Sequence, residues 1–503
     1  MSDDRADQLG RRHFLNRMAA AASAVPLAPA LLAALPATVA PAREAKAAET
    51  AEHKAESGYT PALADYAAKF RYDDAPAEVR QRVKDCITDT VAVILYGGKL
   101  PWSQMIIAHA QKSGPGGKSH ILGTGARSVQ APSAALAHGA MTHAFELDNL
   151  TNPDSGSHPG ATMFSSGLAV AQERGLGGRA LIEGMIAGAE VMIRVGRAAK
   201  GTLEPRGFHA PGTTGSFGGA VTVGKLLQLD TGKMTNALGI AGSLSSGLLE
   251  FAHAGNGAMV KRLHLGRAAE SGVLAASLAA DGFTGPNSVL EGEAGYLHAF
   301  CIDRDVAELT KGLGRDYESM SIMMKRFACH ITAHRPVEAM LDLRNQYKFA
   351  AADIESIAIT GNQRMATTNN LPKPPDALLA QYSIPFSVAL SLYRNPIDPD
   401  SFDENVHRDA SILAMSARVK MLTKAGQPRD DLTATVAVTL KDGRTLTRTT
   451  TEFQGTPARP LDRAGLREKF MLMSKRFREA DMARLFDRLQ NIESERNLDW
   501  ISV

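Results

Sequence analysis

The sequence has few of the residues on which several classes of protein depend. It holds only three cysteines among 503 residues, and Cys86, Cys301 and Cys329 form no CxxC pair. Neither a disulfide framework nor a structural zinc site is therefore expected. Aromatic residues make up 6%, and 56 Lys+Arg stand against 53 Asp+Glu, a net charge of +3 with no basic run. This composition gives no reason to expect a nucleic acid as a partner.

Several catalytic motifs are also missing. The sequence contains no nucleophile elbow, no HExxH pair, no Cys-His signature and no Asp-rich magnesium loop, which argues against hydrolases, metallopeptidases and phosphoryl transfer. A glycine-rich turn within residues 205–227 lacks the Gly-Lys-Ser/Thr ending of a P-loop, and no strand precedes it as in a Rossmann fingerprint. We therefore expect no nucleotide cofactor.

The amino terminus is unlike the rest of the chain. The stretch GRRHFLNRM (residues 10–18) places Arg11 and Arg12 ahead of an alanine-rich apolar segment that is broken by prolines and followed by small residues. This pattern resembles a twin-arginine export signal, and the alternative is a transmembrane anchor. We expect residues 1–47 to be a cleaved signal, which predicts a soluble periplasmic protein without a stable membrane anchor.

Hydrophobic periodicity divides the remaining chain. Apolar residues recur at helical spacing through residues 58–320, and helical spacing returns in 455–503. Between them, residues 321–454 contain the strand-like stretch 354–360 and the alternating stretch 432–450 with an Asp-Gly turn, which predicts a hairpin. The sequence therefore predicts a mainly α protein, with an all-helical domain (58–320 plus 455–503) interrupted by an inserted α+β domain (321–454). Small residues in the helices should let their axes approach closely, leaving loops to carry the larger polar groups.

Two histidines stand just before predicted helices. His158 follows an acidic and turn-rich run, and His209 precedes a Gly- and Thr-rich turn. Free amides and the helix dipole at such positions favour an anion and hold an imidazole nearer neutrality, which suits a proton-transfer group. The alternatives are that Ser157 only caps its helix beside an ordinary loop histidine, and that His209 is satisfied by backbone.

Two further stretches alternate cations with apolar residues and have scarcely a carboxylate nearby. They are residues 259–272, with Lys261 and His264, and residues 324–334, with Lys325 and His330. A solvated amphipathic face is one explanation. Buried cations without a partner are costly, however, and a ligand carrying several carboxylates would supply the partner. Together with the two loop histidines, this set suits proton abstraction next to a carboxylate.

These stretches, in this order, resemble the MmgE/PrpD family, which includes 2-methylcitrate dehydratase, cis-aconitate decarboxylase and iminodisuccinate epimerase. The segments that carry the resemblance are VKRLHLGRAA, KRFACHITAH and QYSIPFSVAL, and the likeness spans about residues 58–500. The resemblance implies that the inserted α+β domain is a lid, that no metal or organic cofactor is used, and that the protein is a homodimer. It also places the active site at Glu146, Thr151, His158, His209, Lys261, Lys325, His330 and Phe386.

The sequence departs from the family pattern at two points. The acidic loop reads Glu146-Leu147-Asp148-Asn149 instead of an Asp-x-Asp-Asp type sequence, with a longer spacer before His158. Phe386 stands where a tyrosine is frequent, so a hydroxyl that decarboxylation could use as a proton donor is lost. Tyr382, four residues earlier, would share a helix face with position 386 and could partly replace it.

We therefore expect a cofactor-independent lyase that acts on a small di- or tricarboxylic acid, with 2-methylcitrate dehydratase-like elimination as first choice. The expected catalytic residues are His158, His209, Lys325 and His330, and the expected substrate-binding residues are Glu146, Thr151, Lys261, His264 and Phe386. Decarboxylation or epimerisation of the cis-aconitate or iminodisuccinate type is an alternative. An exported protein that binds carboxylates without turnover is another.

Overall fold

A computed structural model describes residues 58–125, 128–151, 155–252 and 258–502. The expected signal, residues 1–47, lies outside the described residues. Within the described part no single helix is long and apolar enough to cross a membrane, although the bent pair α4 (Ala77–Gly97) and α5 (Pro101–Ser113) passes by length and composition.

The first part of the described chain is built from helices, so the mainly α prediction is confirmed. One short antiparallel ladder, β1 (Pro115–His120) with β2 (Ser128–Val129), interrupts them. Besides α4 and α5, the helices are α3 (Tyr59–Lys69), α6 (Ala131–Thr142), a π-helical turn (Gly160–Phe164) continuing into α7 (Ser165–Arg174), α8 (Gly178–Ala198), α9 (Ala210–Leu226), α10 (Thr231–Ser243), α11 (Val260–Ala280) and α12 (Tyr296–Phe300).

Glycines set the distance between the central helices. A Cβ added at Gly272 of α11 would lie 2.6 Å from the carbonyl carbon of Gly219 in α9, and one at Gly139 of α6 would lie 2.7 Å from the carbonyl oxygen of Leu265 in α11. Any larger residue would push these helices apart. The expected close approach of small-residue helices is therefore confirmed.

The segment after the helices contains a four-stranded sheet with the order β4-β3-β5-β6. The strands are β3 (Ile354–Gly361), β4 (Val419–Thr423), β5 (Ala434–Leu440) and β6 (Thr445–Thr450), and the helices of this segment are α13 (Ile331–Tyr347), α14 (Gln363–Thr367), α15 (Ala377–Tyr382), α16 (Ile384–Tyr393) and α17 (Ala410–Ser416). β5 and β6 form the predicted antiparallel hairpin, whose turn contains Gly443 at φ 88°. Every second residue of β5 is buried, as the alternation predicts.

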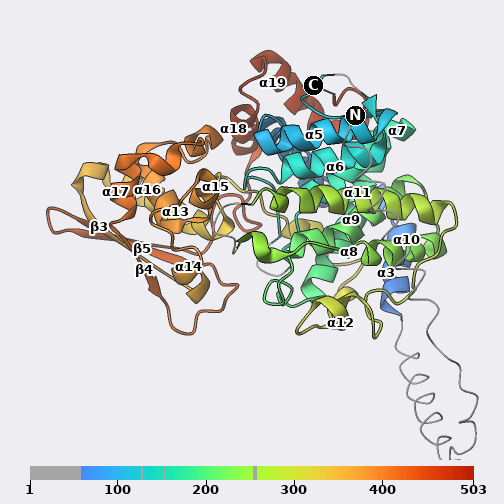
Figure 1. The fold of residues 1–503 in the computed structure, drawn as a ribbon, viewed down its shortest axis with the longest axis horizontal. Coiled ribbons are helices and arrows are strands. Elements are labelled where there is room, and N and C mark those ends of the chain that lie inside the picture. Colours follow the sequence, from blue (N-terminus) through green and yellow to red (C-terminus); the bar gives the residue numbers. More distant parts are fainter. Residues whose placement is uncertain (1–57, 126–127, 152–154, 253–257, 503) are drawn as a thin grey trace, which may run out of the picture. The chain divides into compact units, whose positions relative to one another are not determined.

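The chain then returns to its first helices. Helix α18 (Arg463–Met473) packs against α4, and α19 (Glu479–Leu489) lies beside both (Figure 1). Inside this contact, Lys469 of α18 and Asp89 of α4 form an ion pair of 2.5 Å, with side chains 1% and 0% exposed. The Lys469 ammonium also donates to the carbonyl oxygen of Leu147 at 2.9 Å. Helix α18 therefore contacts the backbone of the acidic loop, residues 146–149, through Lys469.

Candidate active site

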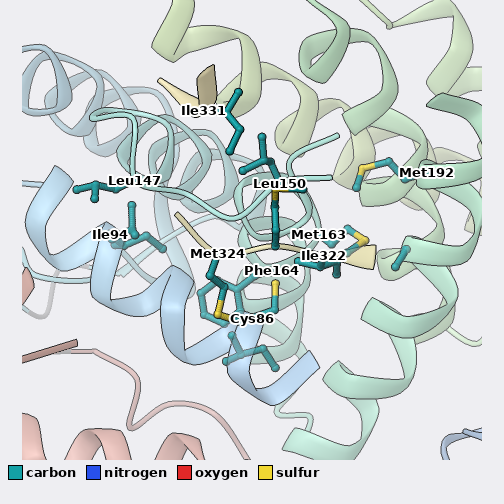
Figure 2. Packing of buried hydrophobic residues seen from close by; sticks show 14 of the residues in the cluster. Cys86, Ile94, Leu147, Leu150, Met163, Phe164, Met192, Ile322, Met324 and Ile331 are labelled. Atoms are coloured by element: carbon teal, nitrogen blue, oxygen red, sulfur yellow. The ribbon is translucent and has the colours of Figure 1, made fainter. Parts of the chain in front are cut away.

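Two segments far apart in sequence form one buried region. Leu150 and Met323 exchange both backbone hydrogen bonds, at 3.0 and 2.9 Å, so the acidic loop pairs directly with the segment that leads to Lys325. Leu150 belongs to the hydrophobic cluster that also contains Ile322 and Met324 (Figure 2). Apolar packing thus fixes the backbone on which the charged residues stand.

Glu146 is the centre of the first group of polar side chains. Its Oε1 pairs with the ammonium of Lys261 and accepts a hydrogen bond from the hydroxyl of Tyr382 at 3.0 Å. Its Oε2 pairs with the ammonium of Lys325 at 2.8 Å. The side chains of Glu146, Lys261 and Lys325 are only 3%, 5% and 2% exposed. One carboxylate therefore engages two buried cations and a phenol.

The charges in this group perturb one another. Burial alone would raise the pKa of Glu146, but Lys261 and Lys325 outweigh it and hold the pKa well below its usual value. Burial lowers the pKa of Lys261, and Glu146 opposes that effect. Burial, reinforced by Glu146, raises the pKa of Tyr382 well above its usual value. The phenol consequently stays protonated.

Asp148 is the centre of a second group. Its Oδ2 accepts from Nδ1 of His143 at 2.8 Å and from Nδ1 of His158 at 2.6 Å. Burial would raise the pKa of Asp148, but the two histidines hold it well below its usual value, so the carboxylate is ionised. Because a carboxylate only accepts hydrogen bonds, both rings carry the proton on Nδ1 and keep the Nε2 lone pair free when neutral. The Nε2 atom of His143 is buried and has no partner among the described hydrogen bonds.

The ligating atoms of His143, Asp148 and His158 lie within 4.8 Å of one another, which is close enough to consider a metal ion. Both nitrogens, however, point at the same carboxylate oxygen at hydrogen-bonding distance. A metal bound to these atoms would have to displace both protons and separate the three groups. The present geometry fits a hydrogen-bonded triad rather than a metal centre.

A second histidine pair adjoins this triad. His209, the residue before α9, has its Nδ1 3.1 Å from Nδ1 of His264 in the first turns of α11. The ring of His209 lies 5.6 Å from that of His143. Burial, followed by His143 and Lys261, lowers the pKa of His209 well below its usual value, and burial with Lys261 lowers the pKa of His264 to about 4. Both rings are therefore neutral near pH 7, and because one Nδ1 donates to the other, only the donating ring keeps a free acceptor nitrogen.

His330 belongs to the same segment as Lys325 and completes the buried region. It is the residue before α13, and its ring stacks on Tyr382 with centroids 4.9 Å apart. Burial lowers its pKa well below the usual value, and Arg364 adds to the effect. His330 thus lies against the phenol that contacts Glu146.

The structure brings together seven of the nine residues selected from the sequence, whereas no described hydrogen bond, ion pair or ring contact joins Thr151 or Phe386 to the two carboxylates. The hydrogen bonds described for Thr151 go to Ser155 and Ser157, within its own turn. Phe386 is fully buried in the hydrophobic core of α16. Neither has a described polar contact with the carboxylates of the two groups.

Three other sequence expectations are wrong. Tyr382 and Phe386 do not share a helix face, because α15 ends at Tyr382 and Ser383 caps a new helix with Pro385 in its first turn. The polar groups are not confined to loops, since Lys261 and His264 lie in α11. The two buried lysines also do not lack a partner within the chain. Glu146, 115 and 179 residues away, supplies it.

Sequence reasoning missed His143 and Asp148 as functional candidates and gave Tyr382 only a secondary part. A signal for the first two was present, since the run HAFELD contains a histidine, a glutamate and an aspartate within six residues. Nothing local indicated that His143 and His158 would share one carboxylate oxygen.

In this mainly α chain, two buried lysines, two buried carboxylates and several neutral histidines lie together between the first helices and the segment that contains the sheet, and side chains of these types suit anion binding and proton transfer. Comparison with known proteins agrees with this description. Residues 61–309 match the MmgE/PrpD N-terminal domain and residues 327–492 match the MmgE/PrpD C-terminal domain. The chain belongs to the MmgE/PrpD family.

Similar proteins include cis-aconitate decarboxylases from fungi and mammals. The protein from Aspergillus terreus is 29% identical over 384 residues, which cover 72% of this chain and 77% of the relative. The Homo sapiens protein is 28% identical over 67% of this chain and 71% of its own length, and the Mus musculus protein is 27% identical over 67% and 70%.

Proposed function

We propose that this protein is a cofactor-independent lyase that removes carbon dioxide from a small unsaturated di- or tricarboxylic acid. The observation that carries the proposal is the protonated Tyr382 hydroxyl, 3.0 Å from Glu146 in a pocket with two buried ammonium groups. The similarity to proteins named cis-aconitate decarboxylase supports the same reaction class.

The proposed reaction needs an electron sink and a proton donor. When the bond between a carboxylate and a carbon next to a double bond breaks, its electron pair shifts the double bond and places negative charge on the far carbon and its retained carboxylate. Lys261 and Lys325 stabilise that charge because their positions are fixed before the reaction. Tyr382 then donates its proton to the carbon, and solvent returns one proton to the phenol, so each turnover consumes one proton.

Elimination of water is the second candidate, and a different observation favours it. Asp148 fixes His143 and His158 with their Nε2 lone pairs free, which supplies bases for abstracting a proton next to a carboxylate. Decarboxylation of this kind needs no base, whereas elimination does.

One experiment separates these reactions. The purified protein is incubated in D2O with cis-aconitate, hydroxytricarboxylates and iminodicarboxylates that carry carboxyl ¹³C, and products are followed by NMR. Decarboxylation predicts ¹³CO2 and a product with one new C–D bond, at an unchanged rate after dialysis against a chelator. Tyr382→Phe should slow this step, and Tyr393→Phe, which alters a tyrosine that is 44% exposed, serves as the matched control. Elimination instead predicts α-proton exchange and loss of hydroxyl. Binding without exchange or turnover would identify a carboxylate-binding protein and contradict the proposal.

The proposal includes a lid. Residues 321–454 supply Lys325, His330 and Tyr382, and two further arginines of this segment, Arg364 and Arg429, lie 3.4 and 3.3 Å from Glu204 of the helical part. A cavity of about 680 Å³ is lined by these arginines and by Ser155 and Ala210, next to the candidate site. Separation of the arginines from Glu204 would widen this route for a substrate.

We also propose that the protein is exported by its twin-arginine segment and works as a periplasmic homodimer. Amino-terminal sequencing of native protein tests the first point, and an amino terminus near Ala48 is the expected result. Sedimentation equilibrium tests the second, with about twice the mass of the mature chain expected. An uncleaved cytoplasmic chain, or a monomer, would contradict the corresponding point.

A further inference from the structure

Glu146 completes a carboxylate-binding site with a carboxylate that belongs to the chain itself. Three donors converge on its two oxygens: Lys261 and the Tyr382 hydroxyl on Oε1, and Lys325 on Oε2. A substrate carboxylate bound between the two lysines would receive the same three contacts. Glu146 therefore occupies a position that would otherwise be suited to a ligand.

The backbone holds Glu146 in this position. Glu146 is one of four described residues other than glycine with positive φ, at 24°. A conformation of this kind costs on the order of 1–3 kcal/mol for a residue with a side chain and persists only where the surroundings impose it. Leu147, the next residue, is fully buried, and its carbonyl oxygen accepts from Lys469. The carboxylate is thus held by a fixed loop and is not a surface side chain that swings in.

Charge counting gives the consequence for a ligand. Lys261 and Lys325 contribute two positive charges and Glu146 one negative charge, so these three side chains together carry a net charge of +1. A third carboxylate on a substrate would lose its hydration, and Glu146 already neutralises one of the two ammonium charges that could compensate for that loss. A ligand with one carboxylate fewer avoids that cost.

We infer that Glu146 is a tethered carboxylate that fills one carboxylate subsite, and that the substrate is accordingly a dicarboxylate rather than a tricarboxylate. The inference rests on the proposed function, because it specifies the substrate of the same site. It makes Glu146 a residue that determines specificity through both its charge and its reach.

Two unreactive ligands test this inference. Glutarate and tricarballylate share one carbon chain and differ only in the central carboxylate, so calorimetry with both measures the effect of that group alone. Wild-type protein should bind glutarate at least about tenfold more tightly than tricarballylate. Glu146→Ala should reverse this order, and added formate should restore tight glutarate binding by filling the vacated subsite. Glu404→Ala, which alters an exposed glutamate, should leave the order unchanged.

Because Glu146→Ala leaves two buried lysines without their carboxylate, it could fail to fold. Glu146→Gln is the second variant, since it removes the charge and keeps the shape of the side chain. It should reduce the ratio of the glutarate affinity to the tricarballylate affinity at least about threefold. If the wild-type protein prefers tricarballylate, or if either folded variant changes both affinities equally, the inference is wrong while the proposed function stands. If the wild-type protein binds neither ligand, the proposed substrate class fails, and the inference fails with it.

Discussion

Replacing Lys325 with methionine is the sharpest test of the buried charge arrangement. The substitution keeps the length of the side chain and removes its charge, which pairs with Glu146 at 2.8 Å in a site where both side chains are at most 3% exposed. Removing one partner of a buried ion pair typically costs about 3–5 kcal/mol when the other charge is left alone. Glu146 keeps Lys261 and Tyr382, so we expect a smaller loss, about 1.5–3 kcal/mol, the scale of a hydrogen bond to a charged group.

The same variant should respond differently to acid. A carboxylate whose pKa is depressed in the folded state stabilises the protein above its unfolded pKa of about 4.3, and this stability is lost as the pH falls through the folded pKa. Lys325 is one of the charges that hold the pKa of Glu146 low. Lys325→Met should therefore raise that pKa and make acid unfolding begin at a higher pH than in the wild-type protein.

The assays are urea unfolding at neutral pH, acid titration followed by circular dichroism, and turnover. Activity should fall by about 10² to 10³, the scale for losing one fixed stabiliser of a developing anion. The double variant Glu146→Gln with Lys325→Met should lose further stability rather than recover it, because Lys261 is then left buried without its carboxylate partner. Lys112→Met, at an exposed lysine, is the control. Normal turnover together with an unchanged acid midpoint in Lys325→Met would refute the ion-pair reasoning.

Three further outcomes follow from single contacts. Tyr382→Phe removes the hydroxyl that donates to Glu146, so the rate should fall at least about tenfold with a stability loss of about 1 kcal/mol; equal rates for both proteins would rule out the phenol as donor. Lys469→Met leaves Asp89 buried without its ion pair and should lower the free energy of unfolding in urea by about 3–5 kcal/mol, an effect that Asp89→Asn should partly reverse. Gly160→Ala would force its Cβ into a threonine hydroxyl of α4, so the melting temperature and turnover should both drop. An unchanged melting temperature would show that α4 can shift enough to accommodate the added methyl group.

Local sequence patterns predicted the features that depend on local interactions. Helix α8 follows the three-and-four spacing of its apolar residues, and the β5–β6 hairpin follows strand alternation and an Asp-Gly turn. His158 and His209 do stand immediately before helices, since a proline follows each of them near the helix start. In each case the signal lies within a few residues of the feature.

The arrangement of charges could not be predicted in this way. Lys261 and Lys325 lie far from Glu146 in sequence. The packing of α11 against α6 brings Lys261 to the acidic loop, and the pairing of Leu150 with Met323 brings Lys325 there. Because the sequence alone does not reveal this pairing, the sequence analysis predicted a bound ligand as the partner of the two lysines. The break at Ser383 had a local cause, the proline two residues later, but which of the two aromatic side chains would reach Glu146 depended on tertiary packing.

The pairing of Lys261 and Lys325 with Glu146 changes how this site can act on a substrate. Two buried lysines without a partner would destabilise the empty protein and would bind any anion strongly, in the ground state as much as in the transition state. With Glu146 between them, each lysine has a carboxylate partner within the chain, and each ammonium still has two N–H donors besides the one on the carboxylate. In the proposed reaction these donors would gain most when a neutral carbon becomes a carbanion. The arrangement therefore favours stabilisation of the reacting state over tight binding of the substrate.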